Sequence, residues 1–71
     1  MLVLGRRVGE RILLITPDGH TTVVTLIRAA GMVGRIGFEA SDDVRIIREE
    51  LATQEQLEAA GLLRRDDVRP L

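Results

Sequence analysis

The sequence predicts a mainly β protein with a C-terminal helix, assembled as an oligomer. Five short runs rich in aliphatic and β-branched residues alternate with turn signals over residues 1–48, a pattern typical of a compact antiparallel sheet structure. Residues 49–61, by contrast, consist largely of good helix formers. The chain has 71 residues and no cysteine, so a disulfide cannot stabilise so small a core, and association with a second chain is favoured.

The first two predicted strands span residues 1–7 and 11–16. The first is an apolar run that ends in Arg6 and Arg7. The second, R-I-L-L-I-T, is apolar on both faces and stops at the tripeptide P-D-G. Such a tripeptide suits a tight turn, because proline presets one dihedral angle and glycine accepts a positive one.

The next three strands follow at similar spacing. The third is rich in β-branched residues, which fit a pleated surface. The fourth alternates, with Ile36 and Phe38 on one face and Arg35 on the other. The fifth, V-R-I-I-R, ends at Arg48, for which the sequence offers no structural reason. These three strands are expected at residues 21–28, 33–39 and 44–48.

The predicted helix, residues 49–61, has two alternative starts. Glu49 and Glu50 suit a first helical turn, where carboxylates face the positive end of the helix dipole. Alternatively, Thr53 with Gln56 three residues later forms a capping box. The sequence therefore divides into a β domain, this helix and a tail that has no strong pattern: residues 1–48, 49–61 and 62–71.

The basic side chains are all arginine: ten arginines occur and no lysine. Residues 1–48 carry seven arginines and five acids, whereas residues 49–71 carry three arginines and six acids. The basic character therefore lies in the β domain and the tail is acidic. Guanidinium groups bind phosphate and base edges with two parallel hydrogen bonds, although a GC-rich genome also produces arginine-rich chains.

Catalysis and metal binding have little support. Ser41 and His20 are single representatives of their types, and cysteine, lysine and tyrosine are absent, whereas nucleophilic catalysis needs a nucleophile and a base in hydrogen-bond reach. His20 beside Asp18 supplies only two ligands from one loop. We expect no enzyme, no cofactor and no metal site. No apolar run approaches the length of a membrane span, so we expect a cytoplasmic protein with no membrane partner.

Nucleic-acid binding remains as a chemistry that the residues permit. Phe38 is the only aromatic residue and is expected in the core, which excludes recognition by base stacking on several aromatic rings. RNA would instead be held by arginines, backbone groups and aliphatic contacts. Solvated surface arginines are the alternative interpretation.

Two motifs resemble the carbon storage regulator family (CsrA/RsmA) of bacterial translational regulators. They are M-L-V-L-G-R-R-V-G-E at the N-terminus and V-R-I-I-R-E-E-L after G-R-I-G-F-E-A, so the resemblance runs from Met1 to about Leu51. It implies five-stranded subunits in an intertwined, strand-exchanged, β-barrel-like homodimer, in which the first strand of one chain lies beside the fifth strand of the other. It also implies binding of GGA-containing hairpin loops in mRNA near ribosome-binding sites, with control of translation or message stability.

The resemblance further implies an RNA site at the edge where those two strands meet. Arg48 matches the key arginine of the family, Leu4 and Arg6 line the site from the first strand, and Ala40 presents backbone groups that read bases. Expected partners are mRNA, small regulatory RNA and a protein antagonist, with no DNA. The residues expected to bind RNA are Leu4, Arg6, Arg7, Arg35, Ala40, Ser41, Val44, Ile46 and Arg48.

Several positions depart from the family pattern. Ser41 stands where proline is common and Asp42 where many members have lysine, which reverses a charge near the expected RNA. Each lost phosphate contact weakens RNA binding. The alternative function is therefore a dimeric protein-interaction module of the same fold with weakened or lost RNA binding. Asp42, the acidic tail and the net charge of −1 favour that alternative.

Overall fold

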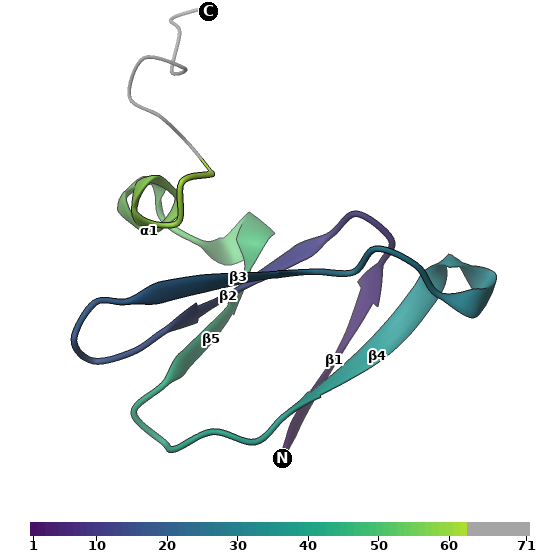
Figure 1. Cartoon of the computed structure of the whole chain (residues 1–71), viewed down its shortest axis with the longest axis horizontal. Coiled ribbons are helices and arrows are strands. Elements are labelled where there is room, and N and C mark those ends of the chain that lie inside the picture. The colour runs from purple at the N-terminus through teal and green to yellow at the C-terminus, as the bar shows by residue number, and fades with distance from the viewer. Residues whose placement is uncertain (63–71) are drawn as a thin grey trace, which may run out of the picture.

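The protein, described over residues 1–62 by a computed structural model, consists of two antiparallel sheets followed by short helices (Figure 1). A two-stranded sheet pairs β1 (Leu2–Arg7) with β4 (Val33–Phe38). A three-stranded sheet has the strand order β3–β2–β5. Its strands are β2 (Arg11–Ile15), β3 (Thr21–Thr25) and β5 (Arg45–Arg48). The predicted fold class, mainly β with a C-terminal helix, is confirmed.

The central strand β2 supplies the core of the three-stranded sheet. Ile12 and Leu13 have no exposed surface, and consecutive residues of a strand point to opposite faces. Both faces of β2 are therefore covered, as its continuous apolar sequence predicts. Leu13 lies between Val23 of β3 and Ile47 of β5.

The predicted strand ends are slightly too long, because turn hydrogen bonds replace ladder pairing there. The amide of Thr16 donates to the carbonyl of His20 across the β2–β3 turn, at 3.0 Å. Leu26 lies just after the end of β3, and its amide donates to the carbonyl of Glu10, at 3.1 Å. Val44 donates to the carbonyl of Ser41, at 3.0 Å, and so belongs to the turn before β5. Gly19 in the β2–β3 turn has a φ of 91°, the conformation for which glycine is suited.

The two faces of the β1–β4 sheet differ in burial. The register places Leu4 opposite Ile36 and Arg6 opposite Gly34, and these side chains share the more buried face. The register also places Gly5 opposite Arg35, on the exposed face. The predicted alternation of β4 is confirmed, but Ile36 and Phe38 are only partly buried on this face, so Phe38 is not in the core as expected. We call these the inner and outer faces of the β1–β4 sheet.

The helical region takes the second of the two predicted starts. A 3-10 helix, η2 (Glu49–Leu51), follows β5 directly, and extended backbone at Ala52 separates it from the α-helix α1 (Gln54–Ala59). Thr53 caps α1 by the predicted box: its side chain accepts from the Gln56 amide and its amide donates to the Gln56 side chain. A second 3-10 helix, η1 (Ala30–Met32), precedes β4. The predicted tail lies outside the described residues, apart from Leu62.

No helix within residues 1–62 combines the length and apolar character needed to cross a membrane.

Candidate nucleic-acid interface

The C-terminal ends of β1 and β5 meet around a hollow of about 510 Å³ that contains three of the predicted arginines. Arg6 and Arg7 reach it from β1, and Arg48 reaches it from the last position of β5. Two carboxylates, Glu10 and Glu50, share the lining. We call this site the arginine hollow. Its complete lining is Gly5, Arg6, Arg7, Glu10, Val33, Arg48 and Glu50.

Arg6 lies inside the protein and is bound to Glu50. Its two terminal nitrogens donate to the two carboxylate oxygens of Glu50, at 2.9 and 2.8 Å, and Nη2 also donates to the carbonyl of Arg11, at 3.2 Å. Arg6 is only 3% exposed. The sequence placed Arg6 among residues that would contact RNA, but the described structure directs its guanidinium to a carboxylate of its own chain.

Arg7 and Arg48 differ from Arg6 in having no carboxylate of residues 1–62 within 4.0 Å. Arg7 is exposed on the outer face of β1, and Arg48 is half-buried, with its Cα opposite that of the fully buried Ile12. Guanidinium groups without a carboxylate partner keep their donors for an external anion such as a phosphate. The arginine hollow therefore presents two available cations beside one that is internally paired.

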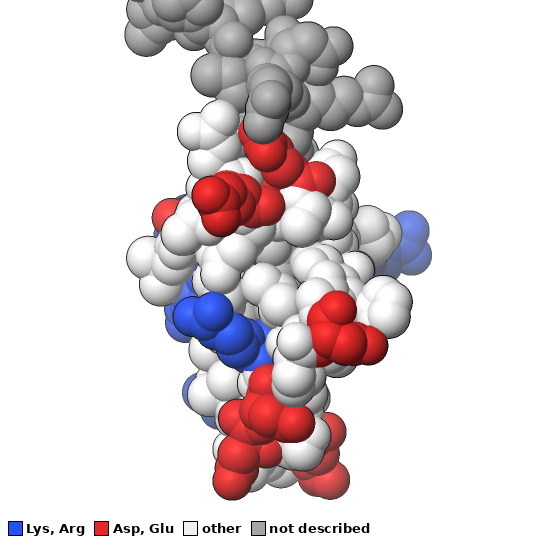
Figure 2. Space-filling view, turned by 90° about the vertical axis from the view of Figure 1, so that its left-hand side faces the viewer, with Lys and Arg blue, Asp and Glu red and all other residues white. Residues whose placement is uncertain are grey.

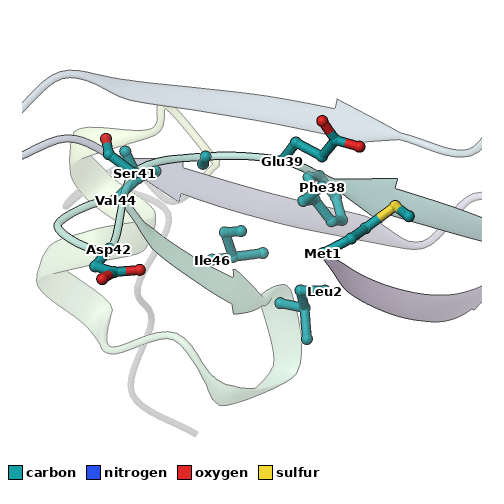
Figure 3. A pocket seen from close by; sticks show the side chains of 9 residues that line it. Met1, Leu2, Phe38, Glu39, Ser41, Asp42, Val44 and Ile46 are labelled. Atoms are coloured by element: carbon teal, nitrogen blue, oxygen red, sulfur yellow. The ribbon is translucent and has the colours of Figure 1, made fainter.

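A second hollow, of about 540 Å³, lies at the opposite ends of the same two strands (Figure 3). Leu2 enters it from the start of β1, with Met1 just before it, and Ile46 enters it from β5, with Val44 from the preceding turn. In Figure 3, Met1, Leu2, Phe38 and Ile46 form an apolar side and the turn before β5 closes the other. We call it the turn hollow. The residues of that turn in its lining are Glu39, Ala40, Ser41 and Asp42.

The predicted site residues are thus divided between two hollows. Ala40, Ser41, Val44 and Ile46 line the turn hollow, and the arginines of β1 and β5 line the other. Ala40 and Ser41 lie between β4 and β5, outside both ladders, so no sheet uses their backbone groups, although the Ser41 carbonyl accepts from the Val44 amide.

Two predicted residues line neither of these hollows. Leu4 is half-buried on the inner face of β1. Arg35 is exposed on the outer face of β4, opposite Gly5, so it does not share a face with Leu4. Within β5, by contrast, Ile46 and Arg48 are two positions apart and share one face, as expected from strand alternation.

Charge separates the two hollows. In the view of Figure 2, acidic side chains form separate groups near the top, at the right and at the bottom of the coloured surface, and basic side chains lie mainly on the left between them. Glu39 and Asp42 are exposed at the turn hollow, and Asp43 follows them in the same turn. In the arginine hollow, hydrogen bonds from Arg6 lower the pKa of Glu50 to about 2, and the same contact raises the pKa of Arg6. Glu50 is therefore a carboxylate at neutral pH and its charge is balanced locally.

Sequence reasoning missed the role of Glu49 and Glu50. It assigned them to the helix dipole, whereas Glu49 accepts a hydrogen bond from Arg11 Nε, at 2.8 Å, and Glu50 binds Arg6. Both pairs join the segment after β5 to the β1–β2 corner. The opposite charges are visible in the sequence as Arg6 and Arg11 near its start and E-E after Arg48. The paired residues are 44 and 38 positions apart, so no local pattern connects them.

Comparison with known proteins gives one consistent family. Residues 1–56 match the CsrA global regulator protein family. A protein named translational regulator CsrA from Thermotoga maritima is 39% identical over 71 residues, which covers 97% of this chain and 81% of the relative. The translational regulators CsrA of a Nocardioides species and of Geotalea uraniireducens are 44% and 38% identical over 54 and 58 residues. These matches cover 76% and 82% of this chain, and 60% and 68% of the relatives.

No solved structure gives a significant match to the chain. The family match covers both motifs from which the resemblance was drawn, and the family consists of regulators, so the expectation that the chain is not an enzyme is confirmed. The chain belongs to the CsrA global regulator protein family.

Proposed function

We propose that this protein binds GGA-containing hairpin loops of messenger RNA near ribosome-binding sites, and so controls translation or message stability in the cytoplasm. The proposal follows from the family and from the name, translational regulator CsrA, of its relatives. One observation of this chain carries it: Arg48, at the end of β5, lines a hollow together with Arg7, and neither guanidinium has a carboxylate partner among the described residues.

The composition of the arginine hollow suits a single-stranded loop. Unstacked bases in a loop expose their edges, and arginine donates two hydrogen bonds to a base edge or a phosphate. The half-buried Arg48 is the residue we assign to base contact, because the strand fixes its position. The exposed Arg7 is assigned to the phosphate backbone. Ala40 and Ser41 would add backbone groups from the turn hollow.

We further propose that the functional unit is a homodimer. Ile12 and Leu13 are the only fully buried hydrophobic residues in the described part of the chain, whereas Met1, Leu2 and Val3 are 83%, 44% and 51% exposed. In residues 1–62, β1 pairs only with β4 and β5 pairs only with β2, so each keeps an unpaired edge. A two-stranded sheet is marginal by itself, and unpaired edges invite pairing with another chain. The edge of β1 would lie along β5 of the partner.

Fluorescence anisotropy with a short RNA hairpin tests the proposed function. A loop that carries GGA is compared with a scrambled loop at about 0.15 M salt, because affinities for nucleic acid depend on salt. Preferential binding to GGA, lost in Arg48→Ala, is the expected result. Arg45→Ala is the matched control, because Arg45 is on the same strand but on the opposite face and is exposed. Equal weak binding to both loops contradicts the proposal.

A second candidate function is a dimeric protein-interaction module. It is favoured by the exposed carboxylates of Glu39 and Asp42 at the rim of the turn hollow, which repel a phosphate backbone. A basic protein partner, such as an antagonist, would bind there. Under this alternative, wild-type protein shows no GGA preference, although sedimentation still gives a dimer.

A further inference from the structure

We propose that Arg6 is a positioning residue: its bidentate contact with Glu50 fixes the end of β5, which carries Arg48, and Arg6 itself does not contact RNA. We call the contact the Arg6–Glu50 clasp. The inference deepens the proposed function and rests on it.

The guanidinium hydrogen-bond donors of Arg6 are used within the protein. The side chain is 2% exposed, Nη1 and Nη2 both bind Glu50, and Nη2 also binds the carbonyl of Arg11. Its remaining nitrogen, Nε, is buried without a hydrogen-bond partner and is 4.0 Å from Glu10 Oε1. To reach an RNA phosphate, this guanidinium would have to leave a two-bond contact with a carboxylate, which is among the stronger hydrogen-bond arrangements in proteins.

The clasp acts on Arg48 through the chain. Glu50 follows Arg48 by two residues, and Arg48 is the N-cap residue of η2. The intervening Glu49 is itself bound by Arg11, and its carbonyl accepts from the Ala52 amide, at 3.1 Å. Before Arg48, the β2–β5 ladder pairs its Cα with that of Ile12. The backbone of Arg48 is therefore held by a ladder on one side and by two ion pairs on the other.

The clasp also changes the electrostatics of the arginine hollow. The carboxylate of Glu50 lies in the same lining as Arg48, and its side chain is 52% exposed. Without a partner, this negative charge would repel an incoming phosphate and attract the guanidinium of Arg48. Arg6 neutralises Glu50 from the buried side, so that Arg48 and Arg7 keep their donors for RNA.

A substitution that removes the charge of Glu50 but keeps its shape separates positioning from simple electrostatics. Glu50→Gln removes a negative charge beside the RNA, which by electrostatics alone strengthens binding. The clasp predicts the opposite: the amide cannot accept both guanidinium hydrogen bonds and the end of β5 loosens. GGA affinity then falls by about fivefold to tenfold, the order expected for one lost intramolecular hydrogen bond. Glu55→Gln, with the same charge change on exposed α1, is the control and leaves affinity unchanged.

The salt dependence of binding shows whether Arg6 contacts a phosphate. Each phosphate contact to a single strand contributes about 0.7 to the slope of log affinity against log salt. We expect Arg6→Gln to weaken GGA binding without changing that slope, at a temperature where sedimentation and circular dichroism show a folded dimer. A slope reduced by about 0.7 in Arg6→Gln, or unchanged or tighter binding in Glu50→Gln, overturns the proposal. If Arg6→Gln does not fold, Glu50→Gln alone decides.

Failure of the proposed function is distinguished by a measurement without RNA. If wild-type protein shows no GGA preference, the function fails, and the clasp is judged by hydrogen exchange at the Ala52 amide, which closes η2. Exchange at least about tenfold faster in Glu50→Gln than in Glu55→Gln supports the clasp, since a lost tether increases local opening. Equal exchange in the two variants rejects it.

Discussion

The arginine hollow and the turn hollow are formed by the same two strands but have opposite chemistry. At the ends of β1 and β5, two guanidinium groups lack carboxylate partners among the described residues, and the nearby Glu50 is neutralised by Arg6. At the starts of these strands, the walls are apolar and the rim carries Glu39 and Asp42. The difference fits the proposal that an anionic ligand binds at the ends of these strands, with backbone and apolar contacts at their starts.

The largest expected effect comes from removing the cation at the arginine hollow. Arg48→Ala should weaken GGA binding by about tenfold to a hundredfold, because a bidentate contact to a base edge is worth about 1–3 kcal/mol. Anisotropy against the GGA and scrambled hairpins measures the loss. The variant should still sediment as a dimer, since Arg48 has no carboxylate partner in residues 1–62. An unfolded variant would show that the arginine is structural and remove the contrast between the two hollows.

A smaller effect is expected from reversing the charge at the turn hollow. Asp42→Lys removes a carboxylate and adds a cation at the rim, so RNA affinity should rise by about threefold to tenfold at about 0.1 M salt. The gain should shrink as salt increases. Asp18→Lys is the control: Asp18 is also exposed but lies in the β2–β3 turn, outside both hollows. Equal gains in both variants would indicate a general charge effect and no RNA contact at the turn.

Acid should open the clasp gradually, and the titration of the Glu50 carboxyl follows this opening at the arginine hollow. Glu50 has its pKa lowered from 4.5 to about 2 by the hydrogen bonds from Arg6. A lowered pKa in the folded state means that the clasp contributes stability above about pH 4.5 and loses it as the pH falls to about 2. Titration of the Glu50 side-chain carboxyl by NMR measures the value directly. In Arg6→Gln the pKa should move up toward 4.5, and an unmoved value would contradict the clasp.

These contrasts show which parts of the molecule are encoded locally. The five strands, the Gly19 turn and the Thr53 capping box depend on residues within a few positions of one another; the sequence predicted the strands and the turn, and gave the box as one of two starts of the helix. The alternation that puts Ile46 and Arg48 on one face is equally local. The family resemblance added the expectation that β1 of one chain lies beside β5 of its partner, which local patterns do not reveal and which stays a prediction.

The ion pairs of Arg6 and Arg11 with the two glutamates could not be predicted from the sequence. Arg6 and Arg7 are adjacent arginines, and nothing in their sequence distinguishes the buried one from the exposed one. The distinction comes from the β1–β4 register, which turns Arg6 to the inner face, and from Glu50, 44 residues away. The same long-range contact explains why E-E follows Arg48: both carboxylates are bound by arginines of the β1–β2 corner, while the α-helix starts later, at Gln54.

The smallest expected effect on RNA binding concerns α1, and it sharpens the comparison by separating the helix from the arginine hollow. Thr53→Ala removes the side chain that accepts from the Gln56 amide, which should destabilise the start of α1 by about 1 kcal/mol. Glu50 lies before the extended Ala52 and stays bound to Arg6, so GGA affinity should remain within about twofold of wild type, a difference below about 0.5 kcal/mol. Amide exchange in residues 54–59, measured beside anisotropy, reports both quantities. A parallel loss of affinity would mean that Arg48 is positioned by the helix as well as by the clasp, and that the arginine hollow extends to α1.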